Sequence, residues 1–159
     1  MIAVTRLSAL VSALLIAHVL AAVVGFGTLF STGGYAAAAR RTRRSEHSPA
    51  VRRYFAPGRN VVGHVLYLVP IFGFALLGAQ GGTDLGRPFP WVGLACWLGA
   101  TLLATRVLWP AQKRVQELMA APSAVGDGLS SCLRRCERAA GASAVLFVIA
   151  LFFMLVQPG

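Results

Sequence analysis

Acidic residues are scarce in this sequence, and recognisable catalytic motifs are missing. The 159-residue chain has 5 Asp and Glu against 15 Lys and Arg, which gives a formal net charge of +10. Charged residues make up only 13% of the chain and hydrophobic residues 57%, a balance that excludes an ordinary soluble domain. The sequence also has no phosphate-binding glycine loop, nucleophile elbow or metalloprotease helix motif. These absences disfavour an enzyme and favour a membrane protein.

The positive charge does not follow a nucleic-acid-binding pattern. Basic residues stand beside apolar segments and form no separate basic domain, so we interpret them as charges that orient membrane helices. Lys113 is the one lysine, and abundant arginine, alanine and glycine favour a bacterial source. The sequence therefore predicts a protein of the bacterial plasma membrane, with no nucleic-acid partner.

Four long apolar stretches take up most of the chain. They cover residues 7–30, 61–79, 91–109 and 139–156. Each stretch is close to the roughly 20 residues with which a helix crosses about 30 Å of hydrocarbon. The sequence thus predicts an all-α bundle of four transmembrane helices, folded as a single membrane domain over residues 1–159.

The distribution of basic residues predicts the orientation. The first loop carries Arg40, Arg41, Arg43, Arg44, Arg52, Arg53 and Arg59, and the third carries Lys113, Arg114, Arg134, Arg135 and Arg138. The second loop has only Arg87, and the tails have only Arg6. By the positive-inside rule, the first and third loops face the cytoplasm and both termini lie outside. We expect the cytoplasmic arginines to contact anionic lipids of the inner leaflet.

The N-terminal stretch has two interpretations. Arg6 before an apolar run, with small residues at Ala36 to Ala39, is compatible with a cleaved signal peptide. An apolar run of about 24 residues is longer than the core of a signal peptide, and the arginines beyond it resist export. We therefore favour a retained first helix.

Small residues predict how the first helix packs. Ala9, Ala13, Ala17, Ala21 and Gly25 recur every four residues and form one face that lets another helix come close. In the second helix Pro70 has no N–H for the carbonyl of Leu66, which predicts a kink.

Ionisable residues inside a membrane are candidates for function because burying them costs free energy. The intramembrane polar residues are His18, His64 and Arg106. Each histidine either hydrogen-bonds a group on another helix or serves as an axial ligand of a b-type haem, and a proton or substrate path is a further alternative. His18 lies deeper than His64, which disfavours a shared haem, so we expect no cofactor. We expect Arg106 to reach lipid phosphate or helix-end carbonyls.

The cysteines do not predict a metal site. Cys96 lies in the third helix as a small apolar residue, and Cys132 and Cys136 are spaced to share one helix face. His47 is the only loop histidine, whereas a zinc site needs four ligands. We expect no bound metal.

Two segments resemble a known family. His18-Val19-Leu20-Ala21-Ala22-Val23-Val24-Gly25-Phe26-Gly27 resembles the first helix of an uncharacterised family of four-helix bacterial integral membrane proteins. Arg106-Val107-Leu108-Trp109-Pro110-Ala111-Gln112-Lys113-Arg114 is similar to the exit of that family's third helix. The resemblance covers nearly the whole chain and implies four helices.

More distantly, the histidine of the first helix is similar to that of copper-resistance membrane proteins and of four-helix protoporphyrinogen oxidases. The oxidases pair it with an intramembrane lysine, whereas Lys113 of this chain lies beyond Pro110. We expect a structural or accessory component, either a subunit of a larger membrane complex or a homo-oligomer. A haem-binding or porphyrin-handling protein is the alternative, and a small oligomeric transporter is the third possibility.

Overall fold

The computed structural model describes residues 2–42, 47–56, 60–120 and 127–156. Every element in these residues is helical. In chain order they are α1 (Ile2–Arg41), α2 (Pro49–Tyr54), the 3₁₀ helix η2 (Asn60–Tyr67), α3 (Leu68–Ala79), the 3₁₀ helix η3 (Thr83–Gly86), α4 (Pro88–Leu103), the π-helical segment η4 (Ala104–Leu108), α5 (Trp109–Ala120) and α6 (Asp127–Val156). The predicted all-α class is confirmed.

Three helical segments are long and apolar enough to cross a membrane. They are Leu7–Arg41, Pro88–Ala120 and Gly128–Val156. The segment Gly63–Ala79 is also apolar but shorter. The predicted apolar stretches therefore correspond to helices, and helix α1 extends well past the predicted end at residue 30 because alanine and arginine are strong helix formers.

The third apolar stretch lies within a longer helical run. We expected the third loop to start at Trp109 and Pro110 and to contain a helix over residues 111–120, and α4, η4 and α5 run without a break from Pro88 to Ala120. The backbone N–H of Trp109 bonds the carbonyl of Ala104, five residues earlier, which is the pattern of a π turn. This wider turn lies directly before Pro110, whose ring would clash with the preceding turn of a regular α-helix. The π turn thus lets the helix continue through the proline.

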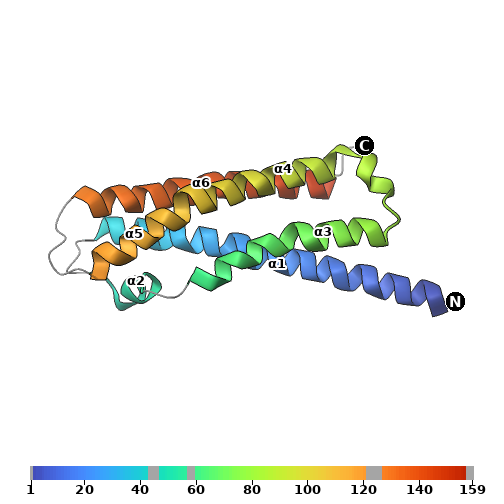
Figure 1. Ribbon diagram of the computed structural model, residues 1–159, viewed down its shortest axis with the longest axis horizontal. Helices are drawn as coiled ribbons and strands as arrows, with labels where there is room; N and C mark the ends of the chain where they lie inside the picture. Colours follow the sequence, from blue (N-terminus) through green and yellow to red (C-terminus); the bar gives the residue numbers. More distant parts are fainter. Residues whose placement is uncertain (1, 43–46, 57–59, 121–126, 157–159) are drawn as a thin grey trace.

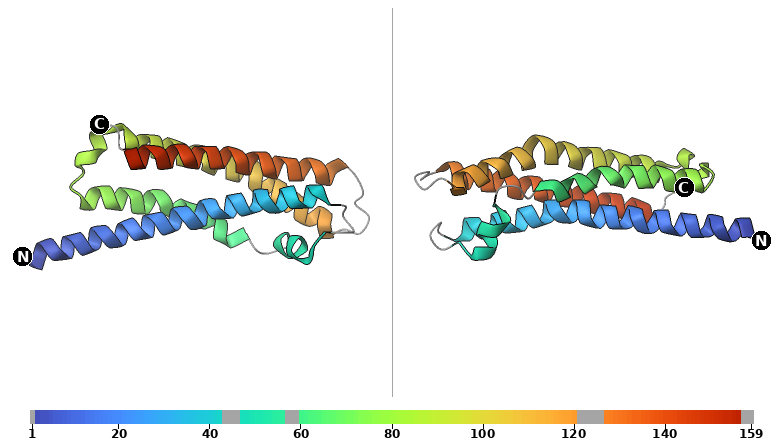
Figure 2. Two further views of the ribbon diagram at one scale, coloured as in Figure 1. Left: turned by 180° about the vertical axis from the view of Figure 1, so that it is seen from behind. Right: turned by 60° about the horizontal axis from the view of Figure 1, so that its bottom comes forward.

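The long helices lie side by side: α1 contacts both α3 and α6, and α6 also contacts α4 (Figure 1). Helix α1 begins, and α6 finishes, at the same end of the molecule, which we call the terminal end (Figure 1). The opposite end carries Arg41, the short helix α2 and the start of α6, and we call it the basic end. The first turns of α1 extend past the other helices at the terminal end (Figure 2).

Small residues set how closely these helices approach. A Cβ added to Gly25 would lie 2.9 Å from the Cα of Leu66, and one added to Gly33 would lie 2.5 Å from the Cβ of Ala140. Neither position leaves room for a side chain, so glycine brings α1 against η2 on one side and against α6 on the other. Aromatic rings fill the space beyond, where Phe147 lies 4.8 Å from Phe26 between ring centroids.

Pro70 has no N–H, so the carbonyl of Leu66, four residues earlier, lacks its usual helical donor. A side chain of another helix supplies a donor instead. The carbonyl of Leu66 accepts a hydrogen bond of 2.8 Å from Nε1 of Trp97 on α4. The helix also changes from 3₁₀ to α between Tyr67 and Leu68, just before the proline. Leu66 is fully buried, where an unpaired carbonyl is costly, so this bond ties α4 to η2.

Candidate functional site

His18 is held by a backbone carbonyl of the neighbouring helix. Its Nδ1 lies 2.9 Å from the carbonyl oxygen of Val69, and its ring covers Gly73, where an added Cβ would lie 3.1 Å from Cε1. A carbonyl oxygen can only accept, so Nδ1 donates its proton to Val69 and Nε2 takes no part in this bond. His18 therefore joins α1 to α3 through Nδ1.

His64 belongs to a different group of residues. Its ring centroid lies 5.2 Å from that of Trp109 and 6.1 Å from that of Tyr67. The structure does not bring His64 to His18. His18 lies opposite Gly73, whereas Gly25, seven residues further along α1, lies opposite Leu66 next to His64. That spacing is about 10 Å along the helix, so the two imidazoles do not face a common space.

Arg106 and the cysteines are also dispersed. Arg106 is exposed on η4, while Cys96 and Cys136 are buried and Cys132 is half-buried. The thiol of Cys136 lies 4.0 Å from the carbonyl oxygen of Leu108, across the contact between α6 and η4. Within the described part of the chain, no three histidine, cysteine or acidic side chains are grouped to hold a metal ion.

The predicted small-residue face of α1 divides into two parts. Ala21 and Gly25 are buried and Ala17 is half-buried, whereas Ala9 and Ala13 are exposed. The structure thus places only the later part of the face against another element of this chain, at η2 and α3.

A polar group at the basic end was not predicted. The hydroxyl of Tyr54 on α2 lies 2.6 Å from Oγ1 of Thr32, and its ring stacks on Tyr35 at 4.2 Å between centroids. Burial raises the pKa of Tyr54, and the Thr32 hydrogen bond opposes part of that rise. Nearby, Nε2 of His47 lies 2.9 Å from the carbonyl oxygen of Ala39 and donates to it. These contacts dock α2 on α1, and the one sequence signal for them was an aromatic pair at positions 54 and 55.

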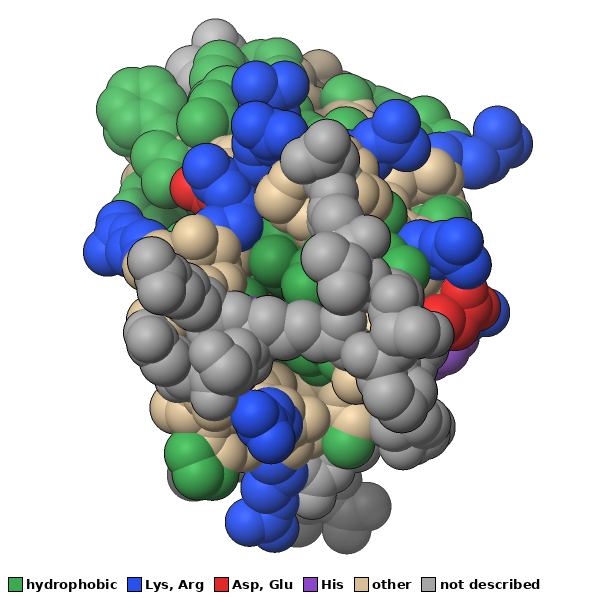
Figure 3. Space-filling model, turned by 90° about the vertical axis from the view of Figure 1, so that its left-hand side faces the viewer, with side chains coloured by type: hydrophobic (Ala, Val, Ile, Leu, Met, Phe, Trp, Pro, Cys, Tyr) green, Lys and Arg blue, Asp and Glu red, His purple; other side chains and the backbone are tan. Residues whose placement is uncertain are grey.

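Basic side chains gather at the same end of the molecule (Figure 3). The described ones are Arg40, Arg41, Arg52, Arg53, Lys113, Arg114, Arg134, Arg135 and Arg138, all of them exposed. Arg43, Arg44 and Arg59 lie outside the described residues. Acidic partners are few, since Arg40 pairs with Glu137 and Arg114 with Glu117. The fold therefore brings the first and third loops, which are far apart in sequence, to one basic end.

Comparison with known proteins agrees with this description. Residues 12–157 match the model of the family described as "Predicted integral membrane protein (DUF2269)". No curated protein matches the chain. No solved structure matches it either. Because the matched segment is most of the sequence, the chain belongs to this family of integral membrane proteins.

Proposed function

We propose that this chain is a structural or accessory component of a bacterial plasma-membrane assembly and that four of its segments cross the membrane. Length supports the fourth crossing. A 3₁₀ helix rises about 2.0 Å per residue and an α-helix about 1.5 Å, so Gly63–Ala79 covers about 28 Å despite having few residues. That length is close to the hydrocarbon thickness of about 30 Å.

The positions of aromatic residues support a membrane-spanning region of the same thickness. Trp91 and Trp109 stand near opposite ends of the α4 to α5 segment, about 27 Å apart along the helix. Nε1 of Trp91 donates to the carbonyl of Leu85, while Trp109 lies against Tyr67 and His64. Tryptophan and tyrosine collect at both surfaces of a membrane, so we infer that these residues mark the two interfaces.

The basic end then faces the cytoplasm and both termini face outward. Cysteines introduced singly at Thr83 and Ala50 test this in whole cells with a membrane-impermeant thiol reagent. The Thr83→Cys variant should react and the Ala50→Cys variant should react only after the membrane is opened. The opposite pattern contradicts the orientation.

We infer that an uncovered face of α1 is the surface that contacts another subunit of the assembly. Gly27, Ser31, Gly34 and Ala38 recur along one face of the helix, and an added Cβ at either glycine meets nothing within 4 Å. Glycine in a helix costs about 1 kcal/mol relative to alanine. Gly25 and Gly33 are explained by close contacts within the chain, whereas Gly27 and Gly34 have no such contact. Small residues spaced this way allow helices of separate subunits to approach closely.

The assembly test compares two substitutions. Gly34→Leu should block a neighbouring helix, so the mass of the native membrane complex should fall while the chain itself stays folded. Gly78→Leu is the matched control, because Gly78 is an exposed helical glycine with nothing within 4 Å of its Cβ position. An unchanged complex mass for Gly34→Leu, or equal loss in both variants, argues against the role.

A haem-binding or porphyrin-handling function is the second candidate, favoured by the hydrogen bond that His18 makes to Val69. Its Nδ1 proton is held by the carbonyl of Val69, which is how proteins orient an imidazole whose Nε2 binds a metal. The absorption spectrum of the protein purified from haem-supplied cells tests this. A stoichiometric Soret band that disappears in both His18→Gln and His18→Leu would favour haem binding over the accessory role.

A further inference from the structure

Helix α6 carries one face that none of the other described elements covers. Its members follow one another at alternating spacings of four and three residues, so they lie in line along the helix. They are Arg134, Arg138, Gly141, Val145 and Val148, and all are exposed. Val145 and Val148 are 60% and 62% exposed, whereas Leu133, Cys136 and Ala140 on the other side are buried. We call these five residues the α6 lipid face.

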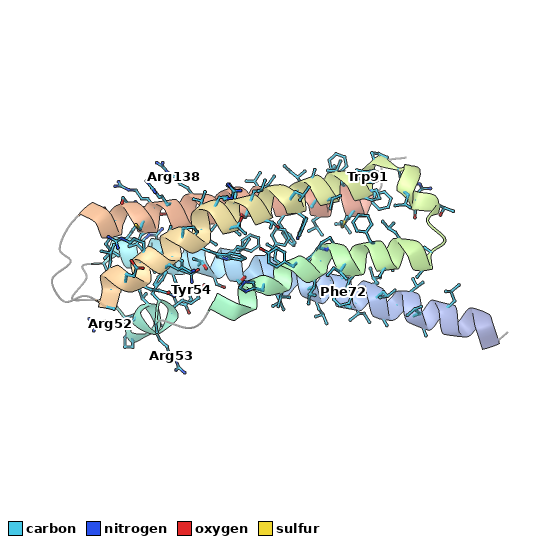
Figure 4. The ribbon with its side chains drawn as sticks, in the orientation of Figure 1. Arg52, Arg53, Tyr54, Phe72, Trp91 and Arg138 are labelled. Carbon is cyan, nitrogen blue, oxygen red and sulfur yellow. The ribbon has the colours of Figure 1, made fainter. Side chains whose placement is uncertain are left out.

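The two arginines of this face are not paired with acidic side chains of the described residues. Arg134 and Arg138 form no ion pair with another described residue, because Glu137 between them pairs with Arg40 of α1. In Figure 4, Arg138 projects from α6 away from the other helices. Residues four apart on a helix have Cβ atoms about 5 to 6 Å apart, so two guanidinium groups can hold the same phosphate.

The apolar part of the face begins directly below the arginines. An added Cβ at Gly141 would meet nothing within 4 Å, which leaves a shallow position between Arg138 and Val145. One leaflet accounts for half of the hydrocarbon, about 15 Å, or roughly ten residues of helix. The segment from Gly141 past Val148 therefore matches the depth of one acyl chain.

Other basic residues lack this combination. Arg52 and Arg53 lie on α2, a helix of 6 residues whose apolar side is buried at Val51 and which offers no exposed apolar strip. Arg114 on α5 pairs with Glu117. Arg106 on η4 forms no ion pair with a described residue and lies in line with the exposed Leu102 and Leu98, but it is a single arginine. Only on α6, among the described helices, do two arginines without an ion pair lie four residues apart on the same face as an exposed apolar strip.

We propose that the α6 lipid face binds a single phospholipid with an anionic headgroup. Its phosphate lies between Arg134 and Arg138, and an acyl chain lies along Gly141, Val145 and Val148. The guanidinium groups recognise the phosphate oxygens by paired hydrogen bonds, which ammonium groups do not reproduce. The proposal deepens the expected contact with anionic lipids and rests on the proposed membrane crossing of α6, but not on the identity of any protein partner.

Native mass spectrometry of the full-length protein tests the site. The purified protein is equilibrated in detergent with equal amounts of dioleoyl phosphatidylglycerol and dioleoyl phosphatidylcholine. We expect the wild type to retain one phosphatidylglycerol in preference to phosphatidylcholine. Arg134→Gln with Arg138→Gln should lower that retention about tenfold, because the variant loses both guanidinium groups that hydrogen-bond the phosphate. Gly141→Leu, which fills the shallow position without changing charge, should also lower retention.

Matched variants distinguish binding at the α6 lipid face from general electrostatic attraction between the protein and anionic lipid. Arg52→Gln with Arg53→Gln removes the same charge from the same end and should leave retention within about twofold. Equal loss in the two charge-removing variants would overturn the proposal. Displacement of the lipid by soluble glycerol 3-phosphate would also overturn it, since it would show an anion site without an acyl position. Arg134→Lys with Arg138→Lys keeps the charge and should still bind less well.

Loss of the lipid can be told apart from failure of the accessory role. The α6 lipid face and the uncovered face of α1 are on different helices. The Arg134→Gln with Arg138→Gln variant can therefore lose its lipid while the mass of the native complex stays the same. An unchanged thermal midpoint of the variants shows that lost lipid is not lost fold. If wild-type protein retains both lipids equally, the site does not exist.

Discussion

From Ala21 to Ala39, helix α1 packs against other elements of its own chain, whereas its first half lies largely exposed. Leu29 and Ala36 are 1% and 0% exposed, but Leu10 and Ile16 are 51% and 60% exposed. The first half is rich in leucine, valine and isoleucine, whereas the later half is rich in glycine and alanine, so the smaller side chains lie where the helices pack. The chain's own contacts therefore cover much of the later half of α1 and leave most of its first half uncovered.

The strongest test of this difference is at two adjacent glycines. Gly33→Leu should destabilise the chain by about 3 kcal/mol, because the position is already filled by Ala140 of α6. Gly34→Leu should leave the stability of the isolated chain nearly unchanged, since its Cβ position is open. Thermal unfolding of the monomer in detergent measures both. Equal destabilisation would mean that the two faces of α1 are not distinguished by packing.

A second pair of substitutions compares the two halves directly. Ala21→Leu should cost about 2 kcal/mol by overpacking, because Ala21 is only 5% exposed. Ala13→Leu lies on the same predicted face but is exposed, and should change the monomer by less than about 0.5 kcal/mol. If Ala13→Leu instead reduces the mass of the native complex, the first half of the face contacts another subunit.

His18 lies at the boundary between the two halves and tests the bond to α3. His18→Leu leaves the carbonyl of Val69 without its side-chain donor and should cost about 1 to 2 kcal/mol. His18→Gln keeps an N–H donor and should retain most of the stability. The same thermal assay compares them. Equal stability of both variants and the wild type would show that the bond contributes nothing.

Tyr54 tests the docking of α2 on the later half of α1. Tyr54→Phe removes the hydrogen bond to Thr32 and should cost about 1 kcal/mol near neutral pH. The raised pKa of Tyr54 means that the folded protein holds the phenol proton more tightly than the unfolded chain does. Stability from this group is therefore complete below about pH 10, and it is lost as pH rises through the folded pKa. The difference between wild type and variant should narrow above pH 10. A constant difference contradicts the assignment.

The smallest expected effect is at the ion pair that joins α1 to α6. The side chains of Arg40 and Glu137 are 36% and 42% exposed, so water and salt screen their attraction. Arg40→Gln should cost less than about 1 kcal/mol, and the cost should shrink as salt is raised. Measurements at low and high ionic strength check this. A large effect independent of salt would indicate that the pair is shielded by a neighbouring molecule.

Particular residues show how far the sequence could predict the site. His18 and His64 could be recognised as unusual because an ionisable group in an apolar segment stands out on its own. Their partners could not be recognised, because Val69 and Trp109 are remote in sequence and ordinary in composition. A helix after Pro110 could be predicted from residues 111–120, but its unbroken connection to α4 could not, because the π turn that accommodates the proline depends on the surrounding packing.

The sequence by itself determined the helices, the membrane class and the gathering of arginine at alternate loops. These follow from composition and charge along the chain, because a long apolar segment has to satisfy its own backbone hydrogen bonds. Tertiary structure alone decided which side of each helix meets another. It separated Gly33 from Gly34 and Ala21 from Ala13, and it directed Trp97 to the carbonyl of Leu66. The physical reason is that rotation of a helix about its axis leaves its hydropathy unchanged, so only contacts between helices fix that rotation.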